Sequence, residues 1–179
     1  GPTHSQNFAA WFVHTPGIKV VAPATAADAK GLLKSAIRDD NPVLFIEDKL
    51  LYGRRQPVPD DPDFTVPLGK ARISRKGEDM TIVAWSRMVE EAEKAADELE
   101  SSGVSAEVID LRTLWPLDTG SIIDSVCRTG RVVIVEEGPG TCGLAAEIAY
   151  RIFEEAFDYL DAPIRRVTSP DIPVPAAPV

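Results

Sequence analysis

The chain has 179 residues, 44% hydrophobic and 26% charged, a composition that supports a buried core and predicts two compact units rather than one. Its 28 acidic residues outnumber the 19 basic ones, and the net charge of -9 argues against a surface that neutralises nucleic-acid phosphates. No apolar run approaches the roughly 20 residues that span a bilayer. We therefore expect no nucleic-acid or membrane partner, and a cytoplasmic location, or the mitochondrial matrix in a eukaryote.

The first residues place a histidine beside an aromatic segment. His4-Ser5-Gln6 runs directly into the Phe-Ala-Ala-Trp-Phe segment at 8–12, which predicts a loop histidine above a buried helix. The sequence starts without an initiator methionine or a leader pattern, and we expect further residues of a complete domain to precede His4.

The next segment predicts a β-α-β unit. Short apolar runs at 18–22 and 43–46 flank residues 25–38, which have helical spacing. The two runs are continuous rather than alternating, as in a parallel sheet covered on both faces. Residues 52–70 are then rich in proline and acidic residues, so we predict a linker there and divide the chain into units 1–60 and 61–179.

The second unit alternates strands and helices. We predict strands at 81–85, 106–111, 131–135 and 164–167, and helices at 88–101, 118–126 and 144–157. This order predicts an α/β fold with a mostly parallel open sheet of about four strands. The proline-rich residues 170–179 fit neither a helix nor a central strand.

The loop at 138–143 reads Gly-Pro-Gly-Thr-Cys-Gly, between a predicted strand and a predicted helix, as in a dinucleotide-binding turn. Glu136 and Glu137 stand directly before it, and carboxylates there would repel a pyrophosphate. We therefore favour glycines that serve a tight turn and close helix packing. A non-catalytic nucleotide-binding module stays as the alternative.

Several oxygen atoms are expected at the end of the helix predicted at 25–38. Pro42 ends the helix near residues whose carbonyls lack helical partners, and Asp39 and Asn41 add side-chain oxygens. Such a cluster suits a hard cation, although Asp and Asn are also common at an ordinary solvated helix end.

Other candidates have simpler explanations. Cys127 and Cys142 lie in no metal-binding pattern and are expected to be half-buried, reduced thiols, and His14 is expected to be structural. Trp115, before a proline at a predicted strand end, could contact a ligand or a neighbouring subunit. Together with Phe8, Trp11 and Phe12, Trp115 is expected to form an apolar patch for association. An assembly module is therefore a further alternative for the function.

Several segments resemble, in order and spacing, the beta subunit of the thiamine-diphosphate-dependent component of 2-oxo acid dehydrogenases, of the pyruvate dehydrogenase type. They are HSQ (4–6), AAW (9–11), PGIKVV (16–21), DAKGL (28–32), AIRD (36–39), LYG (51–53), EVIDLRTL (107–114), PLD (116–118) and RRVT (165–168). The resemblance covers nearly the whole chain. It implies the trailing part of a pyrimidine-binding domain followed by a transketolase-type C-terminal domain, in a chain truncated at both ends.

The resemblance also implies roles for particular residues. His4 would be the catalytic histidine beside the thiamine adduct, during decarboxylation of the 2-oxo acid and reductive acylation of a lipoyl group. Ala36 and Ile37 carbonyls with Asp39 and Asn41 side chains would hold a potassium ion. We assign no residue of this chain to thiamine diphosphate or magnesium, which belong to the complete heterotetramer. We therefore expect the chain alone to be inactive.

The implied partners are an alpha subunit, a second beta subunit and the lipoyl-bearing acyltransferase core. Acetoin and branched-chain 2-oxo acid dehydrogenases share most of the quoted segments, so they remain alternatives for the substrate.

Overall fold

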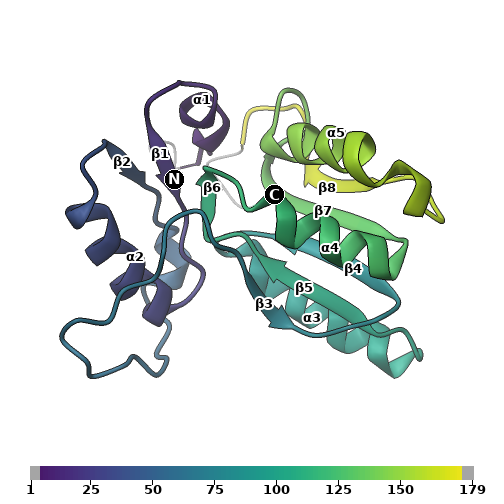
Figure 1. The fold of residues 1–179 in the computed structure, drawn as a ribbon, viewed down its shortest axis with the longest axis horizontal. Coiled ribbons are helices and arrows are strands. Elements are labelled where there is room, and N and C mark those ends of the chain that lie inside the picture. The colour runs from purple at the N-terminus through teal and green to yellow at the C-terminus, as the bar shows by residue number, and fades with distance from the viewer. Residues whose placement is uncertain (1–4, 175–179) are drawn as a thin grey trace.

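A computed structural model describes residues 5–174, which form two sheets (Figure 1). The smaller sheet has the strand order β2-β1-β6, and the larger has the order β3-β5-β4-β7-β8. In Figure 1 the helix α2 lies beside the smaller sheet, and α3, α4 and α5 surround the larger one. The predicted α/β class is confirmed.

The smaller sheet begins as the sequence predicts. Strands β1 (Lys19–Val21) and β2 (Val43–Phe45) pair in parallel, connected by α2 (Ala26–Arg38). Thr25 caps α2 by accepting a hydrogen bond from the N–H of Asp28 at 3.1 Å. A short 3-10 helix, η1 (Lys49–Leu51), follows β2, and the proline-rich residues 54–71 contain neither strand nor helix, as expected for a linker.

In the larger sheet β4 (Met80–Ala84), β5 (Ala106–Asp110), β7 (Val132–Pro139) and β8 (Arg165–Ser169) are parallel, as predicted. A fifth strand, β3 (Arg72–Arg75), pairs antiparallel with β5 at the edge. Our prediction did not include it, because its sequence Arg-Ile-Ser-Arg carries a single apolar residue and no strand-like pattern.

Strand β6 (Thr113–Trp115) joins the two parts of the chain. It follows β5 closely but pairs antiparallel with β1, so the second half of the sequence supplies a strand to the first sheet. The largest core cluster spans both sheets and includes Val20 of β1, Ile109 of β5, Leu114 of β6 and Ile134 of β7. The two parts of the chain therefore share a core, and the division into units 1–60 and 61–179 stays a prediction.

Helices cover both faces of the larger sheet. The inward side chains of α4 (Thr119–Thr129) and α5 (Leu144–Ala156) belong to the core cluster that is shared with β1. Helix α3 (Met88–Ser101) packs on the opposite face, in a second cluster with β4 and β5. A 3-10 helix, η2 (Phe157–Tyr159), extends α5. Among the described residues, no helix is long and apolar enough to cross a membrane.

Helix α1 (Ala9–Val13) confirms the predicted helix but not its burial. Only Ala9 is buried, whereas Trp11 is 72% exposed and Phe8 and Phe12 are also exposed. The rings of Phe8 and Trp11 pack edge to face with centroids 5.3 Å apart. Helix α1 contacts β1, β6 and α5, so the aromatic residues form an exposed patch where the two sheets meet.

Candidate functional site between the two sheets

An ion-pair network lies where β2, β4 and β7 end. Arg87 is the N-cap of α3, directly after the β4–α3 turn. Its Nε donates to Oδ2 of Asp48 at 3.0 Å, and its terminal nitrogen donates to Oε1 of Glu137 at 2.8 Å. Asp48 stands at the start of η1, beyond β2, and Glu137 lies near the end of β7. Arg87 thus joins the two sheets at the edge where α/β proteins bind their ligands.

The network includes Asn7, which precedes α1. Its Nδ2 donates to Oε2 of Glu137 at 3.3 Å, and its Oδ1 accepts the N–H of Ala9 at 3.0 Å, at the start of α1. Both ends of the amide are therefore engaged. The predicted catalytic residue, His4, stands three positions before Asn7 and lies outside the described residues.

Burial and neighbouring charges shift the pKa of Arg87 in opposite directions. Its side chain is 25% exposed, with Asp48 at 12% and Glu137 at 42%. Burial disfavours the charged guanidinium, but hydrogen bonds and attraction from Glu137 and then Asp48 raise the pKa of Arg87 above its ordinary value. The guanidinium thus stays charged between two carboxylates.

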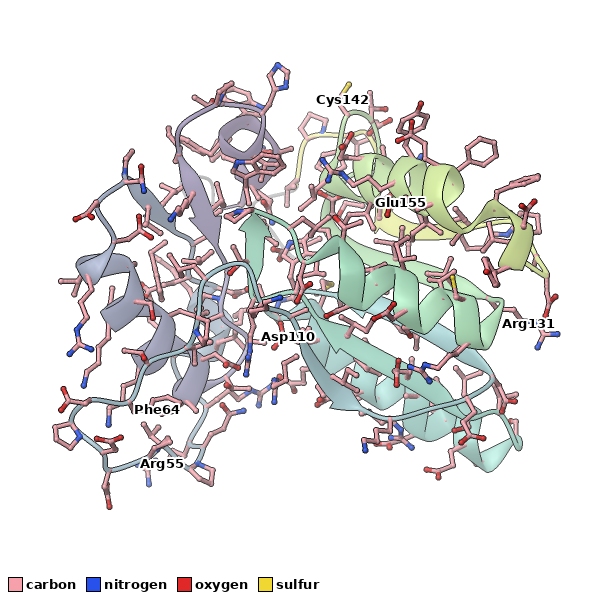
Figure 2. The ribbon with its side chains drawn as sticks, in the orientation of Figure 1. Arg55, Phe64, Asp110, Arg131, Cys142 and Glu155 are labelled. Carbon is pink, nitrogen blue, oxygen red and sulfur yellow. The ribbon has the colours of Figure 1, made fainter. Side chains whose placement is uncertain are left out.

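A second ion cluster is buried between α2 and the larger sheet. Asp28 of α2 contacts a terminal nitrogen of Arg112 at 2.8 Å and Nε of Arg72 at 3.7 Å. Arg72 also donates to Oδ2 of Asp110 at 3.0 Å, and the N–H of Arg112 donates to Oδ1 of Asp110 at 3.1 Å. Both aspartates are buried. Figure 2 shows Asp110 at the junction between the two parts of the molecule.

The cluster changes the acidity of Asp110. Burial, with a smaller contribution from the nearby charge of Asp28, raises the pKa of Asp110 to about 6, although Arg72 opposes the shift. The folded protein thus holds a proton on Asp110 between about pH 4 and 6 that the unfolded chain releases. A group with a raised pKa in the folded state makes stability fall as the pH rises through this window.

We therefore expect Asp110→Asn, which resembles the protonated carboxyl, to remove this pH dependence. Between pH 4 and 7.5, the free energy of unfolding of the wild type should fall by about 2–3 kcal/mol relative to the variant. Urea unfolding at four pH values measures the difference. Asp39→Asn is the control: Asp39 has a pKa lowered to about 2 by Lys19 and Asn41, so its difference from the wild type should stay constant above pH 5. If the stability difference between Asp110→Asn and the wild type also stayed constant with pH, the raised pKa of Asp110 would be contradicted.

The glycine-containing loop before α5 surrounds a carboxylate of the chain itself. Glu136 is buried and accepts hydrogen bonds from the N–H groups of Leu144 at 3.1 Å and Ala145 at 2.9 Å. Burial raises the pKa of Glu136, against these two N–H donors. A Cβ on Gly143 would lie 2.5 Å from the Glu136 carboxylate, so only glycine fits there. Glu136 occupies the helix N-terminus that a phosphate would need, which weakens the nucleotide-binding alternative.

The predicted potassium ligands lie at the end of α2. Asp39 pairs through Oδ2 with Nζ of Lys19 at 2.5 Å, and its Oδ1 accepts both the backbone and the side-chain N–H of Asn41 at 2.9 Å. The carbonyl of Ala36 accepts the N–H of Asp39 at 3.3 Å, and the side chain of Ile37 is exposed. A cation bound here would share the Asp39 carboxylate with an ammonium group. Potassium binding stays a prediction.

A groove of about 490 Å³ lies between α1, β6 and the start of α5. His14 lines it and is exposed. The guanidinium carbon of Arg151 lies 5.8 Å from the ring centre of Trp115, which is partly exposed.

Cys127 and Cys142 are both free, as expected, but Cys142 is exposed rather than half-buried, on the loop before α5 (Figure 2).

Sequence reasoning missed both ion networks. The sequence pattern predicts only a helix at 88–101, although Arg87 directly precedes it, just after a predicted parallel strand. The position of Arg87 after this strand could have indicated a site residue, since parallel strands end at one edge of a sheet. For Asp28 no local signal existed, because its partners Arg72 and Arg112 come from β3 and the β5–β6 turn.

Comparisons with known proteins agree with this fold. The model of the transketolase C-terminal domain matches residues 69–179, and that of the transketolase pyrimidine-binding domain matches residues 1–55. A solved structure described as a split-gene transketolase, inactive beta4 tetramer, superposes with a TM-score of 0.78 at 28% identity, over 96% of this chain and 55% of the other.

Among curated proteins, the chain is similar to subunits named pyruvate dehydrogenase E1 component subunit beta. It is 54% identical to that of Rhizobium meliloti over 97% of this chain and 38% of the relative. It is 51% identical to the mitochondrial subunit of Dictyostelium discoideum, and 54% identical to that of Caenorhabditis elegans. These matches cover 99% and 96% of this chain, and 51% and 50% of the relatives.

The chain thus spans about half the length, or less, of these three curated relatives. The model that matches residues 69–179 covers more than half of the sequence. The chain therefore belongs to the transketolase C-terminal domain family, preceded by a segment that matches the pyrimidine-binding domain of transketolases.

Proposed function

We propose that this chain forms part of the beta subunit of a pyruvate dehydrogenase. This subunit would take part in oxidative decarboxylation of pyruvate with reductive acetylation of a lipoyl group. One observation supports the proposal above all: 51–54% identity to pyruvate dehydrogenase beta subunits over 96–99% of this chain. The match to both transketolase domains is consistent with it.

The proposed catalytic residue is His4, which would stabilise charge or move a proton beside the cofactor adduct. Thiamine diphosphate, when bound with magnesium, would supply the carbanion chemistry. Within residues 5–174 there is no group of three or more His, Cys, Asp or Glu placed to hold a metal ion, and Glu136 fills the N-terminus of α5. As the family resemblance implies, we propose that the partner alpha subunit holds the diphosphate and magnesium.

The remaining proposals concern assembly. We propose as partners an alpha subunit, a second beta subunit and the lipoyl-bearing acyltransferase core, in the cytoplasm or the mitochondrial matrix. The exposed aromatic residues of α1 support an association surface. We also propose the division into residues 1–60 and 61–179, and a potassium ion at Ala36, Ile37, Asp39 and Asn41.

Substrate preference tests the proposal. The beta subunit that carries this chain is co-purified with its alpha subunit and supplied with thiamine diphosphate, magnesium and a lipoyl domain. Acylation of the lipoyl domain is followed by mass spectrometry with pyruvate, a branched-chain 2-oxo acid or acetoin as donor. We expect kcat/KM to be highest for pyruvate. A higher value for the branched-chain acid or acetoin would replace the pyruvate assignment, and no acylation with any donor would overturn the enzyme assignment.

A further inference from the structure

A cavity of about 220 Å³ lies where the first part of the chain meets the larger sheet. Residues just before α2 and at the start of the linker line one side, and residues of β3 and α3 line the other. Its charged side chains are those of Arg54, Arg55, Arg72, Glu90 and Glu93. Glu90 is already paired, with Arg54 at 2.6 Å and with Lys94 at 3.1 Å. The lining thus has more arginines than glutamates, and guanidinium groups commonly bind phosphate and carboxylate oxygens.

Three donor groups of the lining have no acceptor among residues 5–174. Gln56 accepts the N–H of Ala26 through its Oε1 at 2.8 Å, which leaves the two hydrogens of its Nε2 without a partner. Arg72 donates from one terminal nitrogen to Oδ2 of Asp110 at 3.0 Å, and its other terminal nitrogen makes no hydrogen bond. Arg55 forms neither a hydrogen bond nor an ion pair. All three groups can donate to the oxygen atoms of a ligand in the cavity.

Arg72 also connects the cavity to the buried cluster of Asp28, Asp110 and Arg112. The groups that face the Asp110 carboxylate are the guanidinium of Arg72 on β3, the carboxylate of Asp28 on α2 and the N–H of Arg112. Two aspartates and two arginines balance when both aspartates are ionised. Because burial raises the pKa of Asp110 to about 6, the cluster gains a net positive charge below that pH, next to the cavity.

We propose that this cavity binds a small oxyanion of the phosphate type, held by Arg55, Gln56 and Arg72, with an affinity that is coupled to the protonation of Asp110. A tetrahedral oxyanion presents acceptor oxygens in several directions, as donors from the linker and from β3 require, whereas a carboxylate presents two in one plane. Glu93 of α3 opposes an anion, so binding depends on the positive charge that protonated Asp110 leaves on Arg72. The site is independent of the proposed pyruvate dehydrogenase reaction.

Calorimetric titration with sodium sulfate tests the proposal, because sulfate keeps its two charges over the pH range used. The full-length protein that contains this chain is purified in its native assembly, saturated with thiamine diphosphate and magnesium, and kept at constant ionic strength. Sulfate should bind about 5- to 10-fold more tightly at pH 5.5 than at pH 7.5, the effect of removing one negative charge close to the site. An affinity that does not change with pH, or no binding at pH 5.5, would overturn the proposal.

Asp110→Asn predicts a gain of affinity, which damage to the fold would not produce. The asparagine is neutral at every pH, so the variant should bind sulfate at pH 7.5 about as tightly as the wild type does at pH 5.5. Its affinity should then be nearly the same at both pH values. If Asp110→Asn kept the pH dependence of the wild type, the coupling to Asp110 would be wrong.

Gln56→Glu and Arg75→Gln locate the site. The glutamate keeps an acceptor for the N–H of Ala26 but replaces the free donor with a negative charge, so sulfate affinity at pH 5.5 should fall at least about 10-fold. This variant leaves the buried cluster intact, unlike Arg72→Gln. Arg75 lies on the same strand as Arg72 but pairs with Asp97 and Glu100, so Arg75→Gln should bind like the wild type. Equal affinities of the two variants would place sulfate elsewhere and refute the site.

Sodium acetate distinguishes the two kinds of oxyanion. With the wild type at pH 5.5, acetate should bind at least about 5-fold more weakly than sulfate, because it offers fewer acceptor oxygens and one charge instead of two. Acetate that binds as tightly as sulfate, or more tightly, would overturn the assignment to a phosphate-type ligand.

Discussion

Asp28→Ala is expected to lower the free energy of unfolding by about 3–5 kcal/mol, the cost of breaking a buried ion pair and leaving its partner uncompensated. Asp28 is buried and faces both Arg112 and Arg72. The Nε atoms of the two arginines are buried without a hydrogen-bond partner among the described residues, so the cluster has little spare polar contact. Urea unfolding at pH 7 measures the loss.

Two controls separate the cluster from other roles of Asp28. Thr25→Ala removes the cap of α2 and the 2.6 Å hydrogen bond that Thr25 donates to Asp28, leaves both arginine pairs in place, and should cost about 1 kcal/mol. Asp63→Asn breaks an exposed pair with Arg38 at 3.4 Å and should cost less than about 1 kcal/mol. A loss for Asp28→Ala no larger than that for Thr25→Ala would mean that the buried ion pairs add nothing.

Glu136→Ala is expected to destabilise the protein by about 4 kcal/mol, since each buried N–H left without a partner costs roughly 1–3 kcal/mol and a cavity adds to the loss. Both carboxylate oxygens accept hydrogen bonds from the first turn of α5, at Leu144 and Ala145. The variant removes both acceptors from a site that is 5% exposed. Thermal and urea unfolding both report the change.

Glu136→Gln and Glu147→Gln provide the comparison. The glutamine at 136 keeps one acceptor oxygen and the side-chain shape, so it should cost less than the alanine, about 1–2 kcal/mol. Glu147 lies on the same helix but is exposed and pairs with Arg151 at 2.8 Å, so its variant should change stability by less than about 1 kcal/mol. Equal effects of Glu136→Ala and Glu147→Gln would refute the capping role.

The sequence predicted the parallel strands and their helices because each is an apolar run or a helical pattern that can be recognised locally. Strands β3 and β6 could not be predicted in this way. β6 has three residues, Thr113–Trp115, and it becomes a strand only because β1 lies beside it. Its pairing depends on a sequence separation of more than 90 residues, which no local pattern reveals.

The site was predicted less completely than the fold. The charge argument about Glu136 and Glu137 disfavoured a phosphate at the loop, and the structure adds that Glu136 itself caps α5. The roles of Arg87 and Asp28 depend on partners from distant segments, so they emerge only from the folded chain. His4 was assigned from the family resemblance, and its role stays a proposal.

The central claim is that this chain supplies the catalytic histidine of a pyruvate dehydrogenase beta subunit. The most direct measurement compares acetyl transfer from pyruvate to a lipoyl domain in His4→Ala and His14→Ala assemblies that bind the alpha subunit equally well. We predict that His4→Ala loses at least about 100-fold in kcat, a typical size for an acid–base group, and that His14→Ala keeps the wild-type rate. Equal rates in the two variants would contradict the account.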